Sequence, residues 1–158
     1  MIDVGGGDSR LVDHLIARGV RCVTVVDISA AALRRAAERL PGAPVTWLEA
    51  DVSGDWTAPP VDLWHDRAAF HFLTDARDRA RYVQHLTSIL KPGGQAIIAT
   101  FALDGPSKCS GLDVMRYSAA TLANELGPAF RLVETVDDEH LTPTGAVQRF
   151  CYSRFIRN

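Results

Sequence analysis

The sequence has few cysteines, and they form no recognised pattern. Cys22, Cys109 and Cys151 are the only three, their number is odd, and no C-x-x-C pair is present. This excludes a disulfide framework and a zinc knuckle. Unpaired thiols are typical of a reducing compartment, so we expect a cytoplasmic location.

Long apolar runs and an excess of basic charge are also missing. No stretch approaches the ~18 consecutive apolar residues of a membrane span. The first residues contain no basic segment ahead of an apolar one, so we expect neither a membrane anchor nor a secretory signal peptide. The 17 basic residues nearly balance the 19 acidic ones, the net charge is −2, and no basic stripe is sustained. Nucleic acid is therefore not an expected partner.

The composition is that of an ordinary globular domain. Of the 158 residues, 47% are hydrophobic and 23% are charged, which excludes a disordered chain. The length suits one domain, so residues 1–158 are expected to fold as a single unit.

Strand-like and helix-like segments alternate along most of the chain. Continuous apolar or β-branched runs predict buried strands, and apolar residues at helical spacing predict helices. The predicted strands are residues 2–4, 22–26, 45–48, 61–64 and 95–101, and the predicted helices begin near Asp8 or Ser9, at Ser29, at Thr74-Asp75 and at Ser118. Such alternation requires right-handed crossovers between parallel strands.

The end of the chain follows a different pattern. Residues 130–136 and 147–156 read as two strands with no helix between them, which predicts an antiparallel hairpin whose loop contains Pro143 and Gly145. Residues 102–117 read as a long loop, of a length that is usually functional or disordered. The predicted fold class is α/β, a doubly wound and mostly parallel sheet with a C-terminal antiparallel hairpin. Ligands of such sheets bind beyond the carboxyl ends of the strands.

A glycine cluster follows the first of these strands. Gly5-Gly6-Gly7 can adopt positive φ and let the backbone approach a ligand, and the next helix offers free N–H groups to an anion. A tight turn that needs glycine for steric reasons alone is the alternative. No Gly-Lys-Ser/Thr follows, which excludes a phosphate loop, and Arg10 occupies the third glycine position of a dinucleotide motif.

Acidic residues end the next two strands. Asp27 lies twenty residues after Gly7, where a carboxylate can accept both hydroxyls of a ribose. The alternative is a helix cap, although Ser29 is available for that role. Asp51, with the backbone N–H of Val52, is placed to bind the N6 and N1 edge of adenine, and the alternative is an ordinary loop acid.

These residues together resemble a class I S-adenosylmethionine-dependent methyltransferase, over almost the whole chain. Five motifs in the family's order carry the resemblance: Asp3-Val4-Gly5-Gly6-Gly7, Val25-Val26-Asp27-Ile28-Ser29, Glu49-Ala50-Asp51-Val52, Asp62-Leu63-Trp64-His65-Asp66 and Leu90-Lys91-Pro92-Gly93-Gly94. The sequence departs from the family at Gly7-Asp8-Ser9, where another small residue or glycine is usual and Ser9 serves in its place.

The resemblance implies S-adenosylmethionine as the cofactor and assigns a role to each motif residue. The implied cofactor residues are Asp3 and the Gly5-Gly6-Gly7 turn for the methionine end, Asp27 for the ribose, Asp51 and Val52 for the adenine edge, Ile28 for the adenine face and His65 beneath the sulfonium.

The implied reaction is in-line methyl transfer, for which the protein mainly supplies positioning and desolvation. A base is needed only if the acceptor must lose a proton. His65 and Asp66 are the first candidates, since they follow the fourth strand, and His71 and His140 rank behind them. A structural role is the alternative for each, and Arg67 could pair with Asp66. The spacing of His65, His71 and Cys109 matches no metal site, so we predict none.

The expected enzyme is a methyltransferase with a small-molecule acceptor. The open alternatives are a protein-lysine or N-terminal methyltransferase and a binding module that keeps the nucleoside cofactor without turnover. Met1 directly precedes the first strand, whereas the family usually has helices before it. We therefore expect a cofactor pocket that is more open than usual, or one closed by a second subunit in a homodimer.

Overall fold

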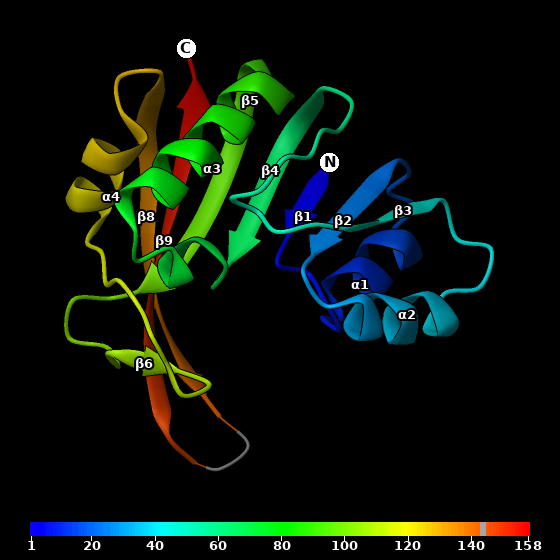
Figure 1. The fold of residues 1–158 in the computed structure, drawn as a ribbon, viewed down its shortest axis with the longest axis horizontal. Coiled ribbons are helices and arrows are strands. Elements are labelled where there is room, and N and C mark those ends of the chain that lie inside the picture. Colours follow the sequence, from blue (N-terminus) through cyan, green and yellow to red (C-terminus); the bar gives the residue numbers. More distant parts are fainter. Residues whose placement is uncertain (143–144) are drawn as a thin grey trace.

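The computed structural model describes residues 1–142 and 145–158. Its order of elements begins as predicted from the sequence, with strands and helices in alternation (Figure 1). The elements are β1 (Ile2–Val4), α1 (Leu11–Ala17), β2 (Val23–Asp27), α2 (Ala30–Arg39), β3 (Val45–Glu49), β4 (Val61–Arg67), a 3-10 turn (Phe70–Phe72), α3 (Ala76–Ile89), β5 (Leu90–Phe101), β6 (Lys108–Cys109), β7 (Leu112–Asp113), α4 (Ala119–Leu126), β8 (Phe130–Leu141) and β9 (Val147–Arg157).

Seven strands form one sheet in the order β3-β2-β1-β4-β5-β9-β8. Strands β1 to β5 pair in parallel, β9 runs antiparallel to β5, and β8 runs antiparallel to β9. The strand order reverses at β1, between β2 and β4, which is where ligands bind in doubly wound sheets. The predicted fold class and the C-terminal hairpin are confirmed.

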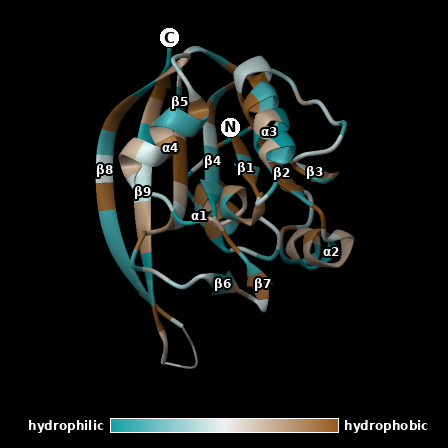
Figure 2. Ribbon diagram, turned by 60° about the vertical axis from the view of Figure 1, so that its left-hand side comes forward, coloured by the Kyte–Doolittle hydropathy of each residue, from teal (hydrophilic) through white to brown (hydrophobic). Residues whose placement is uncertain are grey.

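Two hydrophobic cores lie on opposite faces of the sheet. The larger core contains Tyr82 and Leu86 of α3 and Leu122 of α4, packed against Ile2 and Trp64. The smaller core joins α1 and α2 to the other face, through Val12, Leu33 and Val25. Figure 2 shows apolar residues concentrated on the central strands and mixed with polar ones along β8. No helix of residues 1–142 or 145–158 combines the length and the apolar character that a membrane crossing needs.

Several predicted boundaries were wrong in detail. The predicted fifth strand begins at residue 95, whereas β5 begins at Leu90 and includes residues 91–94. These residues form an irregularity in the strand, because the pairing with β4 shifts from Val61–Leu90 to Leu63–Gln95. β8 continues to Leu141, so His140 lies in a strand rather than in a loop. The long 102–117 segment contains the small β6–β7 hairpin. Pro143, predicted in the hairpin loop, lies outside the described residues.

The first helix also starts differently from the prediction. Arg10 precedes its first turn and makes no side-chain cap. The hydroxyl of Ser9 instead accepts a hydrogen bond from the backbone N–H of Leu11. By contrast Ser29 caps α2 as predicted, because its Oγ accepts from the N–H of Ala32.

Candidate functional site

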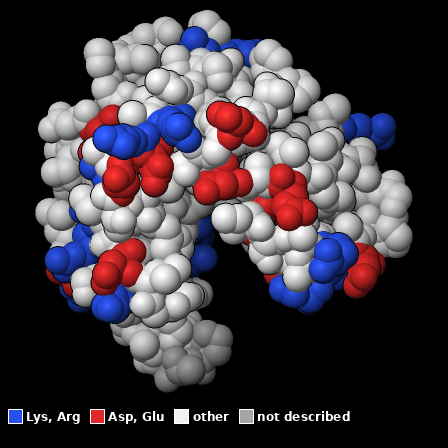
Figure 3. Space-filling model, in the orientation of Figure 1, with Lys and Arg blue, Asp and Glu red and all other residues white. Residues whose placement is uncertain are grey.

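Two adjoining hollows lie at the carboxyl ends of β1, β2 and β4. The one that we call the outer hollow has a volume of about 670 Å³, and the one that we call the glycine hollow has about 540 Å³. Gly5 and Asp27 line both of them. Figure 3 shows a deep notch in this face of the molecule, with acidic side chains gathered at its closed end. The site is therefore continuous, concave and negatively charged.

The glycine turn is built so tightly that no side chain fits in it. Gly5 and Gly7 have φ values of +68° and +38°, in the left-handed region. A Cβ at Gly6 would lie 2.6 Å from Oδ2 of Asp3, and a Cβ at Gly7 would lie 2.8 Å from Oδ2 of Asp27. Both contacts are closer than carbon and oxygen tolerate. The turn thus keeps both carboxylates against bare backbone.

Asp27 serves both the local backbone and the hollow. Its Oδ1 accepts a hydrogen bond of 2.8 Å from the N–H of Ser29, whereas the cap of α2 is Ser29 itself and not Asp27. Its Oδ2 remains the oxygen near the glycine turn. The next residue, Ile28, is 70% exposed although it is aliphatic, and it lines the outer hollow. The Asp27 carboxylate can accept hydrogen bonds from a polar group of a ligand. The exposed Ile28 side chain can pack against the face of a flat ring next to that group.

The loop after β3 places Asp51 and Val52 on the opposite wall of the outer hollow. Oδ1 of Asp51 accepts hydrogen bonds from the N–H and the hydroxyl of Ser53, each 2.8 Å long. The carbonyl of Val52 accepts from Nε1 of Trp56, whose ring stacks on His85 of α3 at 4.8 Å between centroids. These contacts hold the loop so that its acidic side chain stays beside the hollow.

His65 and Asp3 form a close pair in the glycine hollow. Nδ1 of His65 lies 2.7 Å from Oδ1 of Asp3, and the two side chains are 17% and 3% exposed. An ionised carboxylate only accepts hydrogen bonds, so Nδ1 of the ring donates to it. No hydrogen bond to Nε2 of His65 occurs in the described part of the chain. The ring is thus oriented by Asp3, and Nε2 is the ring nitrogen left for a ligand.

Asp66 lies beneath the site rather than in it. Its carboxylate is fully buried and accepts from the N–H groups of Ala69 and Phe70 and from the hydroxyl of Tyr82 at 2.7 Å. Burial raises the pKa of Asp66 to about 6, and it also raises the pKa of Tyr82 well above its ordinary value. Asp66 lines neither hollow. The structure therefore corrects the pairing of Asp66 with His65 as bases, and it also excludes an ion pair with Arg67, whose partner is Tyr152.

The turn that Asp66 holds forms part of the wall. Ala68 has a φ of +68°. Cβ of Ala69 packs so closely on Gly5 that a Cβ added at Gly5 would lie only 2.6 Å from it. Both alanines line the outer hollow. The buried carboxylate therefore shapes the hollow through the backbone that it binds.

Of the two lower-ranked histidines, one lies in the core. His71 is fully buried, and desolvation lowers its pKa to about 4. Trp64 and Phe70 are also fully buried, whereas Phe72 lines the outer hollow. No group of three or more histidine, cysteine, aspartate or glutamate residues within 1–142 and 145–158 is arranged to hold a metal ion.

The hollows bring together nine residues predicted from the sequence and several that were not. The predicted set is Asp3, Gly5, Gly6, Gly7, Asp27, Ile28, Asp51, Val52 and His65. The additional lining residues include Arg67, Leu112, Asp113 and Tyr152. The unusual length of the 102–117 segment was the only sequence signal for Leu112 and Asp113. Tyr152 could not be found in this way, because it comes from the antiparallel strand β9.

Comparison with known proteins identifies the motifs of this site. A family model described as a methyltransferase domain matches residues 1–94. Uncharacterised methyltransferases of Mycobacterium tuberculosis and Mycobacterium bovis are 35% identical to the chain over 128 residues, which is 80% of this chain and 62% of each relative. The chain thus spans less than two thirds of the length of these relatives. The trans-aconitate 2-methyltransferase of Rhodopseudomonas palustris is 37% identical over 109 residues, or 66% of this chain and 40% of that protein.

Solved structures share the whole fold. The N-methyltransferase NodS of Bradyrhizobium japonicum superposes with a TM-score of 0.78 at 21% identity, over 99% of this chain and 84% of that one. The 1,6-didemethyltoxoflavin-N1-methyltransferase of Burkholderia thailandensis, solved with S-adenosylhomocysteine, gives 0.77 at 21% identity, over 99% and 70%. At this level of identity the likeness concerns the fold.

Proposed function

Since the chain belongs to the class I S-adenosylmethionine-dependent methyltransferase family, we propose that it methylates a small-molecule acceptor from this cofactor. The family's cofactor is S-adenosylmethionine, whose positively charged sulfur carries the methyl group that is transferred. The acceptor and the activity of the whole protein are proposals, as the relatives are longer than this chain.

The residues of the two hollows fit this cofactor. The bare glycine turn admits a ligand to backbone contact, Asp27 offers a carboxylate oxygen to a ribose, and the exposed Ile28 offers an apolar face to a base. Asp3 and Asp51 would take the amino group of the methionine end and the adenine edge. The acidic lining also complements a ligand that bears positive charge. A Cβ at the glycine turn would fill this cradle, and that observation carries the assignment.

His65 is the residue that we propose as a base, where the acceptor must lose a proton. Asp3 holds its Nδ1–H, and Nε2 is the atom that would accept the proton. Asp66 has a positioning role, because it binds the turn that forms the wall. An acceptor whose nucleophile carries no proton at neutral pH would need neither step, and the site would then act by orientation and exclusion of water.

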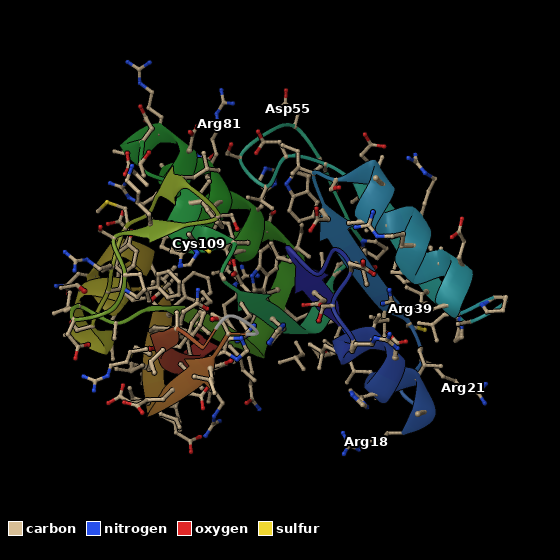
Figure 4. The ribbon with its side chains drawn as sticks, turned by 90° about the horizontal axis from the view of Figure 1, so that it is seen from below. Arg18, Arg21, Arg39, Asp55, Arg81 and Cys109 are labelled. Carbon is tan, nitrogen blue, oxygen red and sulfur yellow. The ribbon has the colours of Figure 1, made fainter. Side chains whose placement is uncertain are left out.

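A calorimetric titration with S-adenosylhomocysteine tests the cofactor assignment. Asp27→Asn keeps the size of the side chain and an acceptor for Ser29, and removes the charge that would bind the ribose. We expect binding to weaken by about 1–3 kcal/mol, the worth of a charge-assisted hydrogen bond. Asp55→Asn is the matched control, since Asp55 is exposed and points away from the site (Figure 4). Equal affinities of the two variants, or no binding by the unchanged protein, would overturn the assignment.

The small-molecule acceptor is supported by the named substrate of one relative, a trans-aconitate methyltransferase. A protein-lysine or N-terminal methyltransferase and a cofactor-binding module without turnover are the alternatives. The three functions are separated by the release of S-adenosylhomocysteine during incubation with cell-extract fractions. Release with small-molecule fractions supports the proposal, release with protein fractions supports a protein methyltransferase, and release with neither supports the binding module. Cytoplasmic location remains a proposal, supported by the three free cysteines. The homodimer remains one as well, and light scattering tests it.

A further inference from the structure

Arg67 is held in a fixed position at the edge of the glycine hollow. It is the last residue of β4, and it stands opposite Ala99 of β5 in the sheet. Its Nε–H donates to the hydroxyl of Tyr152 at 2.8 Å, and its guanidinium carbon lies 4.7 Å from the centre of the Phe150 ring. Both partners come from β9. An exposed arginine held by two contacts loses less freedom when it binds a ligand than a free one does.

The charge of Arg67 has no acidic partner in the described residues. Its Nε is occupied by Tyr152, and no hydrogen bond from either Nη atom occurs within 1–142 and 145–158. Two arginines of β9 differ from Arg67 in this respect. Arg149 binds Asp104 and Glu139, and Arg154 binds Glu134. The planar pair of Nη groups on Arg67 is therefore available to an anion from outside the chain.

Among residues 1–142 and 145–158, Arg67 is also the only lysine or arginine that lines either hollow. Their described lining contains five aspartates against this single cation: Asp3, Asp8, Asp27, Asp51 and Asp113. A negatively charged ligand group would be repelled by the aspartates of this lining. Apart from the backbone N–H groups of the glycine turn, the Arg67 guanidinium is the group of the described lining that would attract it.

The guanidinium is directed away from the glycine turn. Its contacts are with β9, two strands beyond β4, whereas the glycine turn and Asp27 belong to β1 and β2. Tyr152 lines the glycine hollow and also a third hollow, of about 470 Å³, over β5, β9 and β8. Arg67 thus stands where the cofactor residues end and this further surface begins.

We propose that Arg67 binds a carboxylate of the methyl acceptor, so that the acceptor class is a small carboxylic acid. Tyr152 and Phe150 set the guanidinium, and the two Nη groups form the paired hydrogen bonds that a carboxylate accepts. This inference rests on the proposed function, because it names the second substrate of the same site. The other source of a carboxylate in this site is the amino-acid end of the cofactor, and the test separates the two.

The test measures two ligands in calorimetry on Arg67→Gln and the unchanged protein. The first is S-adenosylhomocysteine, and the second is trans-aconitate, a tricarboxylate, added to protein saturated with the first. We expect Arg67→Gln to weaken trans-aconitate at least about tenfold, the equivalent of one charge-assisted contact. Affinity for S-adenosylhomocysteine should stay within about twofold, since no hydrogen bond or ion pair joins Arg67 to the cofactor residues in the described part of the chain.

Three further variants sharpen the result. Arg21→Gln removes the same charge from a side chain that points away from the protein (Figure 4), and it should bind both ligands normally. Arg67→Lys keeps the charge without the planar pair of donors, so it should recover only part of the affinity. Tyr152→Phe frees the guanidinium and should weaken trans-aconitate less than Arg67→Gln does. Unchanged thermal midpoints show that the variants are folded.

The remaining outcomes overturn the inference in distinguishable ways. If Arg67→Gln weakens S-adenosylhomocysteine but leaves 5′-methylthioadenosine, which lacks the amino-acid end, unaffected, Arg67 binds the cofactor and the acceptor assignment is wrong. If trans-aconitate binds the variant and the unchanged protein alike, or binds neither while S-adenosylhomocysteine binds both, the carboxylate assignment is wrong and the proposed function stands. Failure of the unchanged protein to bind S-adenosylhomocysteine overturns the proposed function itself.

Discussion

Replacing Tyr82 by phenylalanine tests whether the buried hydrogen bonds under the site hold the fold. The hydroxyl of Tyr82 donates to Oδ2 of Asp66 at 2.7 Å and accepts from Nε1 of Trp64 at 2.8 Å. All three side chains are fully buried, so water does not replace the lost oxygen. The phenylalanine ring would keep the edge contact with Trp64 and the tilted contact with Phe70. The substitution therefore isolates one oxygen atom.

The expected cost follows from the two bonds that this oxygen makes. A hydrogen bond to a charged group contributes about 1.5–3 kcal/mol, and a buried N–H left without a partner costs about 1–3 kcal/mol. Together we expect Tyr82→Phe to lower the free energy of unfolding by roughly 3–5 kcal/mol at pH 7.5, a large share of the ~5–15 kcal/mol typical of a domain. The loss should shrink below pH 5. Burial raises the pKa of Asp66 to about 6, so its carboxyl is neutral there and needs the donor less.

Tyr117 provides a matched control in the same core. It is 3% exposed and its ring lies 5.5 Å from that of Phe70, but its hydroxyl has no hydrogen-bond partner among the described residues. Tyr117→Phe makes the same chemical change and should leave stability unchanged or raise it slightly, because it removes an unsatisfied polar atom. Urea unfolding followed by circular dichroism measures both variants. Similar losses in the two would refute the argument that partners, rather than burial of the hydroxyl, decide the cost.

Three other changes have defined outcomes. Gly7→Ala should lower stability by about 1–2 kcal/mol, because φ is +38°, and should abolish calorimetric binding of S-adenosylhomocysteine, because the new Cβ would displace the Asp27 carboxylate. Arg39→Met should weaken that binding several-fold without abolishing it. The Arg39 side chain extends from the end of α2 toward α1 and binds Asp8 and the carbonyl of Ser9, next to the glycine turn (Figure 4). An unchanged affinity would mean that the glycine turn keeps its conformation without these contacts. Asp66→Asn should change the pH profile of unfolding. The pKa of Asp66 is raised, so its contribution is largest below the unfolded pKa of ~3.9 and is lost as pH rises through about 6. The stability of the unchanged protein relative to the variant should therefore fall across that window, and a constant difference would contradict the raised pKa.

The fold was predictable because its signals are local. The apolar run of β2, the serine cap of α2 and the glycines after β1 each occupy a few neighbouring residues, and parallel connectivity follows from their alternation. The residues that line the hollows were predictable for the same reason, since most of them lie in the last residues of a strand or directly after it. The β6–β7 hairpin was not, because strands as short as Lys108–Cys109 carry no periodicity. The pairing of β6 with β7 depends on contacts in the folded chain that leave no pattern in the sequence.

Asp66 and His65 have different surroundings because β4 is longer than the strand predicted from the sequence. The strand predicted from the sequence ends at Trp64, which places His65 and Asp66 together after it as candidate bases. β4 continues to Arg67, and successive side chains of a strand point to opposite faces. Trp64 and Asp66 then share the face that packs against α3, and His65 and Arg67 share the face that opens on the glycine hollow. The side chains of His65 and Asp66 therefore leave β4 on opposite faces, and only His65 lines the glycine hollow. Had the strand been extended by three residues, alternation alone would have separated the buried acid from the histidine, and it would have placed Arg67 beside the site.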